Sequence, residues 1–194
     1  MGRSDYADQK VINLPAPDYE AADVLVIREP EQLKALGDDL RSRIVVLLRE
    51  RARSTTDLAE QLKLAKGTVA HHIKVLEKAG LIRVVRTRKV RAMTESYYGR
   101  TARLFLLRGA DTDAEVAQTA VAASLRRAVE EMLPPAEGDR ATSAVLRKRL
   151  SDADARRLEQ RLEKLQRDVL ELPDDPDGMP YGVLVSLFRR AADA

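Results

Sequence analysis

The sequence contains no cysteine and no tryptophan. The absence of cysteine excludes disulfides, thiolate redox sensing and every metal site with a cysteine ligand. Aromatic residues make up only 4% of the chain, so the core must be built from aliphatic side chains. No apolar run approaches the roughly 18 residues of a membrane span, and the N-terminal MGRSDYADQK lacks the apolar core of a signal peptide. We therefore expect a cytoplasmic protein with no membrane partner.

Charge is abundant instead, at 34% of residues, and it is unevenly distributed. Residues 1–110 hold 21 Lys and Arg against 14 Asp and Glu, a net of +7, whereas residues 111–194 hold 13 against 17, a net of −4. Residues 83–108 hold eight basic residues and one acid, Glu95, again a net of +7. Such a local basic stripe is typical of a nucleic-acid-binding surface. A solvated strand surface is the alternative interpretation.

The N-terminal part of the chain changes character at about residue 23. Residues 1–22 carry two prolines and no periodicity, which predicts a disordered tail. The apolar run 24–27 predicts a short strand. Residues 30–51 have helical periodicity, and Gly37 divides them into two helices.

A pair of helices follows at a close spacing. Residues 55–63 predict a short helix that Ser54 or Thr55 can cap. A second helix begins near residue 66 and ends at Gly80, a favourable residue for a helix C-terminus. Two helices joined by a tight turn predict a helix-turn-helix unit.

After this unit the sequence becomes rich in β-branched and basic residues. Residues 81–98 predict a β-hairpin with its tip near residues 87–89, although no Asn-Gly or Asp-Gly dipeptide marks the turn. The run ARLFLL, residues 102–107, predicts a further strand.

The C-terminal part alternates predicted helices with predicted strands. We expect a helix near 113–133, a strand at 143–150, a helix from 151 to about 172, and a closing strand at 181–188. The apolar residues of the second helix follow a 3,4,3,4,3 spacing, typical of an a/d seam. The seam residues are Ala155, Leu158, Leu162, Leu165, Val169 and Leu172.

The two histidines of the chain, His71 and His72, are adjacent. On a helix they point about 100° apart, whereas a helical zinc pair requires i,i+4 spacing. With no third histidine and no cysteine, we expect neither a metal site nor a cofactor. His72 falls on the face of Val69 and Leu76 and is interpreted as an edge-of-core residue. His71 falls on the opposite face with Lys74 and Lys78, the kind of surface that a recognition helix presents to DNA.

These pieces together resemble the winged helix-turn-helix of ArsR-type bacterial repressors. The similar run extends from Gln32 to Leu107 and includes ALGDDLRSRIVVLL, TTDLAEQLKLAKGTVAHHIKVLEKAGLI and VVRTRKVRAMTESYYGRTA. The middle piece is the most specific, with its Leu-Ala pair, its Thr in the turn, its His-Ile-Lys-Val-Leu run and its Ala-Gly-Leu. Where the family often places a capping Ser or Thr, this chain has Ala65. Because the family's Cys and His/Asp metal ligands are absent, metal sensing does not carry over.

The resemblance implies a homodimeric transcriptional regulator, and we expect a mainly α fold with a small β component. The expected parts are the tail at 1–22, a winged helix-turn-helix domain at 23–108, and a C-terminal helical or α+β dimerisation region at 109–194. Helix 66–79 would lie in the major groove and the wing on the backbone or minor groove. The predicted DNA-binding residues are Lys66, Thr68, His71, Lys74, Arg86, Arg88, Lys89 and Arg91. The predicted dimerisation residues are Leu158, Leu162, Leu165 and Val169.

Three functions are compatible with this sequence. The first is sequence-specific binding of double-stranded DNA by a homodimeric transcriptional regulator, which we expect to be a repressor. The second is a winged-helix module that binds a partner protein. The third adds a small organic effector held between the C-terminal helices, where the apolar stripe of residues 116–132 either lines a pocket or packs in the dimer core. No nucleophile with its base, phosphate-binding glycine loop or metal set is visible, so we do not expect an enzyme.

Overall fold

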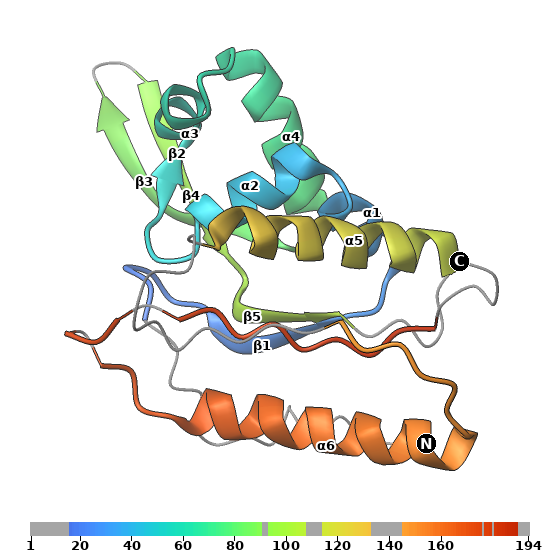
Figure 1. The fold of residues 1–194 in the computed structure, drawn as a ribbon. Coiled ribbons are helices and arrows are strands. Elements are labelled where there is room, and N and C mark those ends of the chain that lie inside the picture. The colour runs from blue at the N-terminus through green and yellow to red at the C-terminus, as the bar shows by residue number, and fades with distance from the viewer. Residues whose placement is uncertain are drawn as a thin grey trace. The chain divides into compact units, whose positions relative to one another are not determined.

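The computed structural model describes residues 16–90, 93–107, 114–132, 145–175, 177–179 and 181–189 of the 194-residue chain. The described residues form two compact units, which divide between Arg127 and Ala128. The first unit thus continues past residue 108 through most of one further helix. It holds all the strands of the described residues (Figure 1).

The elements follow one another largely as the sequence predicted, and Gly37 separates the first two helices. The fold is mainly helical with a small β component, which confirms the expected class. In chain order the elements are β1 Ala22–Ile27, α1 Pro30–Leu36, α2 Asp39–Leu47, β2 Arg53–Ser54, α3 Thr55–Leu62, α4 Lys66–Lys78, β3 Ile82–Val90, β4 Met93–Arg100, β5 Ala102–Leu107, α5 Ala114–Glu131 and α6 Asp152–Glu171.

Short-range signals in the sequence set the helix boundaries. The Asp38 side chain accepts a hydrogen bond from the Arg41 amide at 2.9 Å and caps α2. Ser54 and Asp57 form a reciprocal capping box at the start of α3, which satisfies amides that would otherwise lack a partner. α4 ends before Gly80, whose φ of +70° is a conformation that glycine adopts without steric cost.

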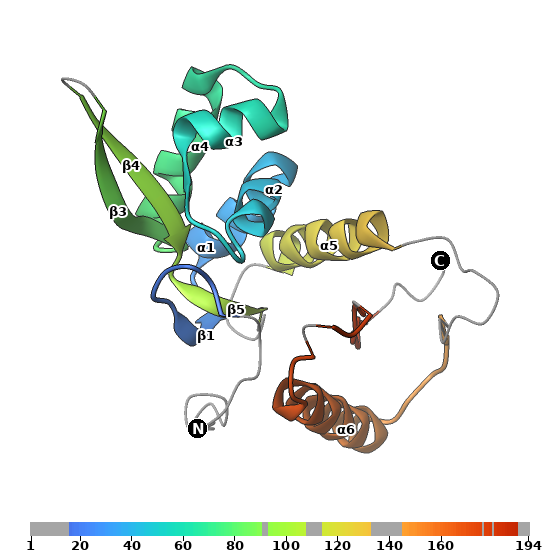
Figure 2. The same ribbon diagram turned by 90° about the vertical axis from the view of Figure 1, so that its left-hand side faces the viewer.

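Two small sheets complete the first unit. β1 and β5 pair in parallel, from Ala22 opposite Ala102 to Ile27 opposite Leu107. β2, β4 and β3 form an antiparallel sheet in that order, so the β3–β4 hairpin has the two-residue β2 along one edge. The hairpin extends away from the helices α3 and α4 and forms the wing of the fold (Figure 2).

The hairpin is longer than predicted, and its tip lies elsewhere. Cross-strand pairing continues to Val90 opposite Met93, so residues 87–89 belong to the paired ladder and do not form the tip. The prediction of the tip was wrong because the alternating β-branched and basic pattern continues through residues 87–89 and carries the ladder with it. A register shift between Val84 and Arg86 marks a bulge in β3.

The core of the first unit is aliphatic, as the scarcity of aromatic residues predicted. It is built where α1 to α4 meet the start of β3, and helix α5 adds Ala120. Tyr98 and Phe105 only pack against its edge. The largest side chains with under 2% exposure are Ile27, Leu33, Ile44, Leu48, Leu58, Val69, Ile73, Leu76, Leu81 and Ile82.

The described part of the second unit contains the last turn of α5 and one complete helix, α6. Ser151 caps it, and its hydroxyl accepts a hydrogen bond from the Asp154 amide at 3.1 Å. Two predicted strands are not formed. Residues 145–150 and 181–188 have no sheet pairing among the described residues. Both runs are apolar enough to resemble a strand, but the part of this unit that is described offers no β edge for them to join.

The first described residues correct the prediction of a disordered tail over residues 1–22. Residues 1–15 lie outside the described part, but the Asp18 amide donates to the Glu50 carbonyl at 2.8 Å and Ala22 opens β1. These long-range contacts give residues 18–22 a fixed place, which local periodicity could not reveal. Among the described helices none is both long enough and apolar enough to span a membrane.

Candidate nucleic-acid interface

Helix α4 presents one buried face and one open face. Val69, Ile73 and Leu76 are at most 1% exposed and anchor the helix in the core. The four predicted recognition residues, Lys66, Thr68, His71 and Lys74, are all exposed. A Cβ atom added at Gly67 would meet nothing within 4 Å, so the space beside the first turn is open. The sequence therefore placed the two faces of α4 correctly.

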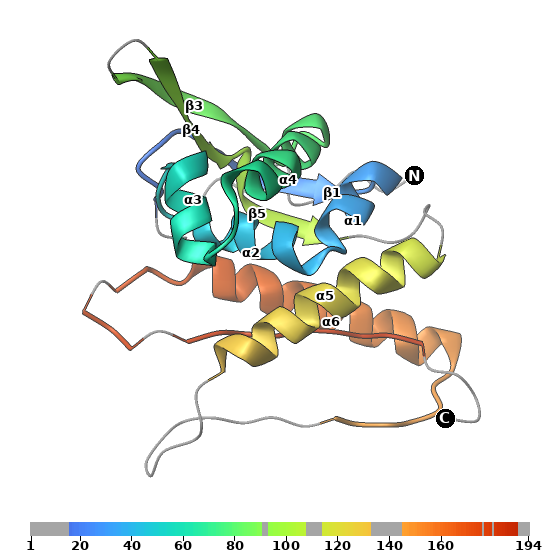
Figure 3. The same ribbon diagram turned by 90° about the horizontal axis from the view of Figure 1, so that it is seen from above.

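The turn between α3 and α4 positions the first turn of α4 and its open face. Lys63 ends α3 in the left-handed conformation, with φ of 55°, and the Leu64 amide donates to the Ala59 carbonyl at 3.0 Å. α4 then begins after Ala65, whose side chain makes no capping hydrogen bond. The first-turn amides of α4 thus have no side-chain cap, and an anion such as a phosphate can satisfy them. Figure 3 shows α3 and α4 side by side with the hairpin beyond them.

The two histidines have different surroundings, as expected. His72 lies at the edge of the core, where its Nδ1 atom is 3.7 Å from Oδ1 of Asp38, the residue that caps α2. His71 is exposed, and its ring meets that of His72 edge-on with centroids 5.5 Å apart. In the described parts of the chain, no group of three His, Cys, Asp or Glu side chains is placed to hold a metal ion.

The wing has two faces, which the pairing register separates. Cross-strand partners share a face, so Arg83, Arg86 and Arg88 lie on one face with Glu95, Tyr97 and Gly99. We call this the outer face. The other, inner face carries Tyr98 against the core and, farther out, Thr87 and Lys89. The predicted wing residues are therefore divided between two faces, and Arg91 lies outside the described residues.

The basic residues of the wing also differ in what they contact. Arg86 donates to Oδ2 of Asp18 at 3.2 Å, and its guanidinium carbon lies 5.1 Å from the centre of the Tyr97 ring. Arg88 lies directly opposite Glu95 in the register. Lys89 is exposed, and within the described residues the structure records no ion pair for it. Lys89 is thus the most available of the three cations.

An N-terminal segment, residues 18–20, covers the base of the outer face, and sequence reasoning missed it. The Asp18 carboxylate accepts from the Ala52 amide at 2.6 Å. The Tyr19 hydroxyl donates to the Leu48 carbonyl and accepts from the Arg100 amide at 3.0 Å. The Tyr19 ring lies where a side chain on Gly99 would be, 2.7 Å from an added Cβ atom. The only sequence signal was Gly99 within a strand, since such a glycine often marks the close approach of another segment.

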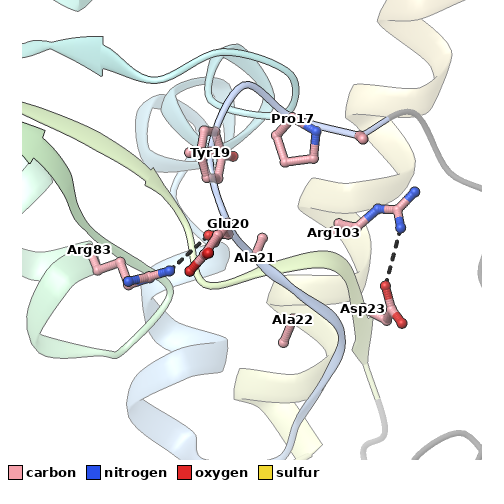
Figure 4. Close-up of a pocket in the computed structure, with 9 residues that line it drawn as sticks. Pro17, Tyr19, Glu20, Ala21, Ala22, Asp23, Arg83 and Arg103 are labelled. Carbon is pink, nitrogen blue, oxygen red and sulfur yellow. Dashed lines mark hydrogen bonds and ion pairs between the residues drawn. The ribbon is translucent and has the colours of Figure 1, made fainter.

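A shallow pocket of about 500 Å³ lies beside this segment. Figure 4 shows the residues that line it. Arg83 donates to the Glu20 carbonyl at 2.8 Å on one side. Arg103 pairs with Asp23 at 3.2 Å on the other. Both guanidinium groups therefore already have partners. Arg83 ties the N-terminal segment to β3, and Arg103 ties β1 to β5.

Arg100, at the end of β4, is a buried cation with 7% exposure. Its guanidinium carbon lies 4.3 Å from the centre of the Phe105 ring. Burial, and then the positive charge of Arg49, lowers the pKa of Arg100 to about 10. The group stays charged at neutral pH, and its burial against Phe105 indicates a structural role at the base of the wing.

These helices and this hairpin define a winged helix-turn-helix, a class in which a recognition helix and a β-wing contact DNA. Residues 38–84 match the family model described as bacterial regulatory protein, arsR family. The segment is therefore an ArsR-type helix-turn-helix of a DNA-binding transcriptional regulator, which confirms the predicted resemblance.

Solved structures of regulators show similarity over about half of this chain. HlyU from Vibrio cholerae is 23% identical, with a TM-score of 0.32, covering 51% of this chain and 87% of its own. The transcriptional repressor BigR from Xylella fastidiosa is 23% identical, with a TM-score of 0.32 over 53% and 86%. The cadmium sensor CMTR from Mycobacterium tuberculosis is 20% identical, with a TM-score of 0.31 over 59% and 98%. Similarity at this level carries no argument about function. No curated protein matches the chain.

Proposed function

We propose that this protein is a homodimeric, sequence-specific DNA-binding transcriptional repressor. α4 enters the major groove, and the wing lies on the phosphate backbone or in the minor groove. The observation that carries the proposal is the open face of α4, where Lys66, Thr68, His71 and Lys74 are exposed together on a helix anchored by buried Val69. Solvated basic faces are common on proteins, but here the face belongs to the second helix of an ArsR-type helix-turn-helix.

The candidate residues divide into two roles. Side chains on α4 can reach base edges, and lysine favours the O6 and N7 atoms of guanine. Thr68, near the start of the helix, can donate to a phosphate. Arg86, Arg88, Lys89 and Arg91 of the wing supply affinity that does not depend on sequence, because phosphate contacts fix orientation without reading bases.

The dimer is proposed to form through the seam of α6, where Leu158, Leu162, Leu165 and Val169 repeat at heptad spacing. Leu165 is 45% exposed in the single chain, so the seam retains apolar surface for a partner helix. A small organic effector stays part of the proposal as a ligand of the C-terminal region, where Val129 at the end of α5 and Met132 just after it are 61% and 55% exposed.

Footprinting on the DNA upstream of the protein's own gene tests this function. We expect a protected site with two half-sites about one helical turn apart, since a two-fold symmetric dimer requires that spacing. The protein concentration that protects this site should be far lower than the concentration needed to bind random DNA of equal length. If the protein binds neither the upstream DNA nor random DNA at low salt, this result would instead support the alternative function, a winged-helix module that binds a partner protein.

A further inference from the structure

The position of Asp18 is fixed by contacts to backbone groups that involve no arginine side chain. Its amide donates to the Glu50 carbonyl at 2.8 Å. Its Oδ1 atom accepts from the Ala52 amide at 2.6 Å. The next residue, Tyr19, is held by hydrogen bonds to the backbone of Leu48 and Arg100. The carboxylate is therefore placed by the backbone around it, and its second oxygen remains for another partner.

That partner is Arg86, whose Nη2 atom lies 3.2 Å from Oδ2 of Asp18. The same nitrogen lies 3.5 Å from the Ala52 carbonyl, and the guanidinium stacks on the Tyr97 ring. Arg86 is thus folded back along the base of the wing. Residue 20 of the same segment accepts a hydrogen bond from Arg83 through its carbonyl, so the segment occupies two of the three arginines on the outer face.

We propose that Asp18 is an internal counter-anion that withholds Arg86 from DNA phosphate and so lowers the affinity of this protein for DNA. The inference rests on the proposed function, because it assigns one more residue that determines the strength of DNA binding. A carboxylate and a phosphate are alternative acceptors for the same guanidinium fork. While Asp18 holds Arg86, one counterion fewer is released when the wing meets the backbone.

Asp18 competes with DNA phosphate for Arg86 only partially. The side chains of Arg86 and Asp18 are 49% and 39% exposed, and pairs this exposed are weak. The Arg86 contact to DNA is therefore reduced in occupancy by Asp18 and not abolished. A modification or partner that lifts residues 18–20 from the wing would strengthen DNA binding without touching α4.

The test measures the salt dependence of binding to a random duplex. Asp18→Asn keeps an oxygen for the Ala52 amide and removes the charge. The slope of log K against log salt should steepen by up to about 0.9, the contribution of one phosphate contact. Between 50 and 200 mM salt this corresponds to roughly a 3.5-fold larger loss of affinity. Circular dichroism checks folding, and Asp18→Ser is the second neutral variant if Asp18→Asn is unstable.

A double-mutant cycle with Arg86→Gln assigns the effect to the pair. Arg86→Gln should flatten the slope more in the Asp18→Asn background than in the unaltered chain, because there Arg86 is free to meet phosphate. Asp23→Asn is the matched control, since it removes the same charge from a carboxylate paired with Arg103. Any change in DNA affinity or salt slope caused by Asp23→Asn should be the same whether residue 86 is Arg or Gln.

Equal effects of Arg86→Gln in both backgrounds would overturn the inference. So would an unchanged slope for the neutral variants at residue 18. If Lys89→Ala still flattens the slope in those experiments, DNA binding by the wing stands and only the inference about Asp18 fails. If the unaltered protein binds neither operator nor random DNA, the proposed function fails together with it.

Discussion

At the scale of single residues, Tyr19 connects the N-terminal segment to two elements at the base of the wing, α2 and β4. Its hydroxyl lies between the carbonyl of Leu48, at the end of α2, and the amide of Arg100, at the end of β4. Its ring fills the space above Gly99. One side chain therefore sets the distance between the helical core and the base of the hairpin.

Tyr19→Phe should lower the free energy of unfolding by about 1–2 kcal/mol at neutral pH, because it leaves two backbone groups without their partner. It should also change the response to alkali. Burial raises the pKa of the Tyr19 hydroxyl above its ordinary value of 10, and the Arg100 amide and charge only partly offset this. The neutral phenol is thus favoured in the folded state, and its stabilisation is complete below pH 10 and lost as pH rises through the raised pKa.

Urea unfolding midpoints at pH 8 and at about pH 10.5 measure this effect. The unaltered protein should lose more stability over this interval than Tyr19→Phe does. Tyr181→Phe, at a side chain with 71% exposure, is the control and should behave as the unaltered protein. Equal pH dependence in all three would mean that the Tyr19 hydroxyl is not buried as described.

The adjacent histidines should separate binding from stability. His71→Gln changes an exposed residue of the open face of α4 and should weaken operator binding with little effect on thermal unfolding. His72→Gln disturbs a side chain 3.7 Å from the Asp38 cap and should cost about 1 kcal/mol of stability. Fluorescence anisotropy with operator DNA and thermal melts of both variants measure the two effects. A reversed pattern would mean that α4 presents another face to DNA.

At the scale of elements, the wing should contribute affinity without sequence preference. Arg88→Ala with Lys89→Ala should weaken binding to operator and random DNA alike. The slope of log K against log salt should become shallower by about 0.9 for each phosphate that the wing no longer neutralises. Lys74→Ala on α4 should instead affect operator DNA more, because its side chain can reach bases.

Titrations of both DNAs between 50 and 200 mM salt make this comparison. Lys34→Ala, on α1, removes one exposed charge that belongs neither to the wing nor to α4, and it is the control. A salt slope that stays the same in the wing variant, or falls equally in the Lys34 variant, would contradict a role for the wing in phosphate contact.

Which elements the sequence could predict depends on how local their causes are. The capping box of Ser54 and Asp57 and the buried stripe of α4 are written within a few residues, and their helices were predicted to within one or two residues. The segment around Asp18 was missed because its partners lie 68 residues away at Arg86 and 81 residues away at Arg100. Strict alternation along β3 separates Lys89 from Arg86 and Arg88, but it would also have separated Arg83 from them. The bulge near residue 85, which no sequence pattern marks, places Arg83 on the same face as Arg86 and Arg88.

At the scale of the whole molecule, assembly should depend on α6. Leu162→Asp would place an unpaired charge in the proposed seam, at a cost of several kcal/mol. Sedimentation should then find a monomer where the unaltered protein is a dimer. Operator binding should fall with it, since each half-site would be bound alone.

Gln160→Asp is the matched control, because this exposed position lies on the same helix outside the seam. It should leave the dimer intact. A Leu162→Asp protein that remains dimeric would place the seam inside one chain and the dimer contact elsewhere.

The parallel pairing of β1 with β5 also determines when the first unit can fold during synthesis. Ala22 must meet Ala102, 80 residues later, and Ile27 beside Leu107 is fully buried in the core of the first unit. Synthesis runs from the N-terminus, so β1 leaves the ribosome long before its partner exists and must wait without one. The matched segment, residues 38–84, contains neither strand. Expressed alone, it should expose the surface that Ile27 covers, so the stretch that identifies the family is shorter than the stretch that builds the core.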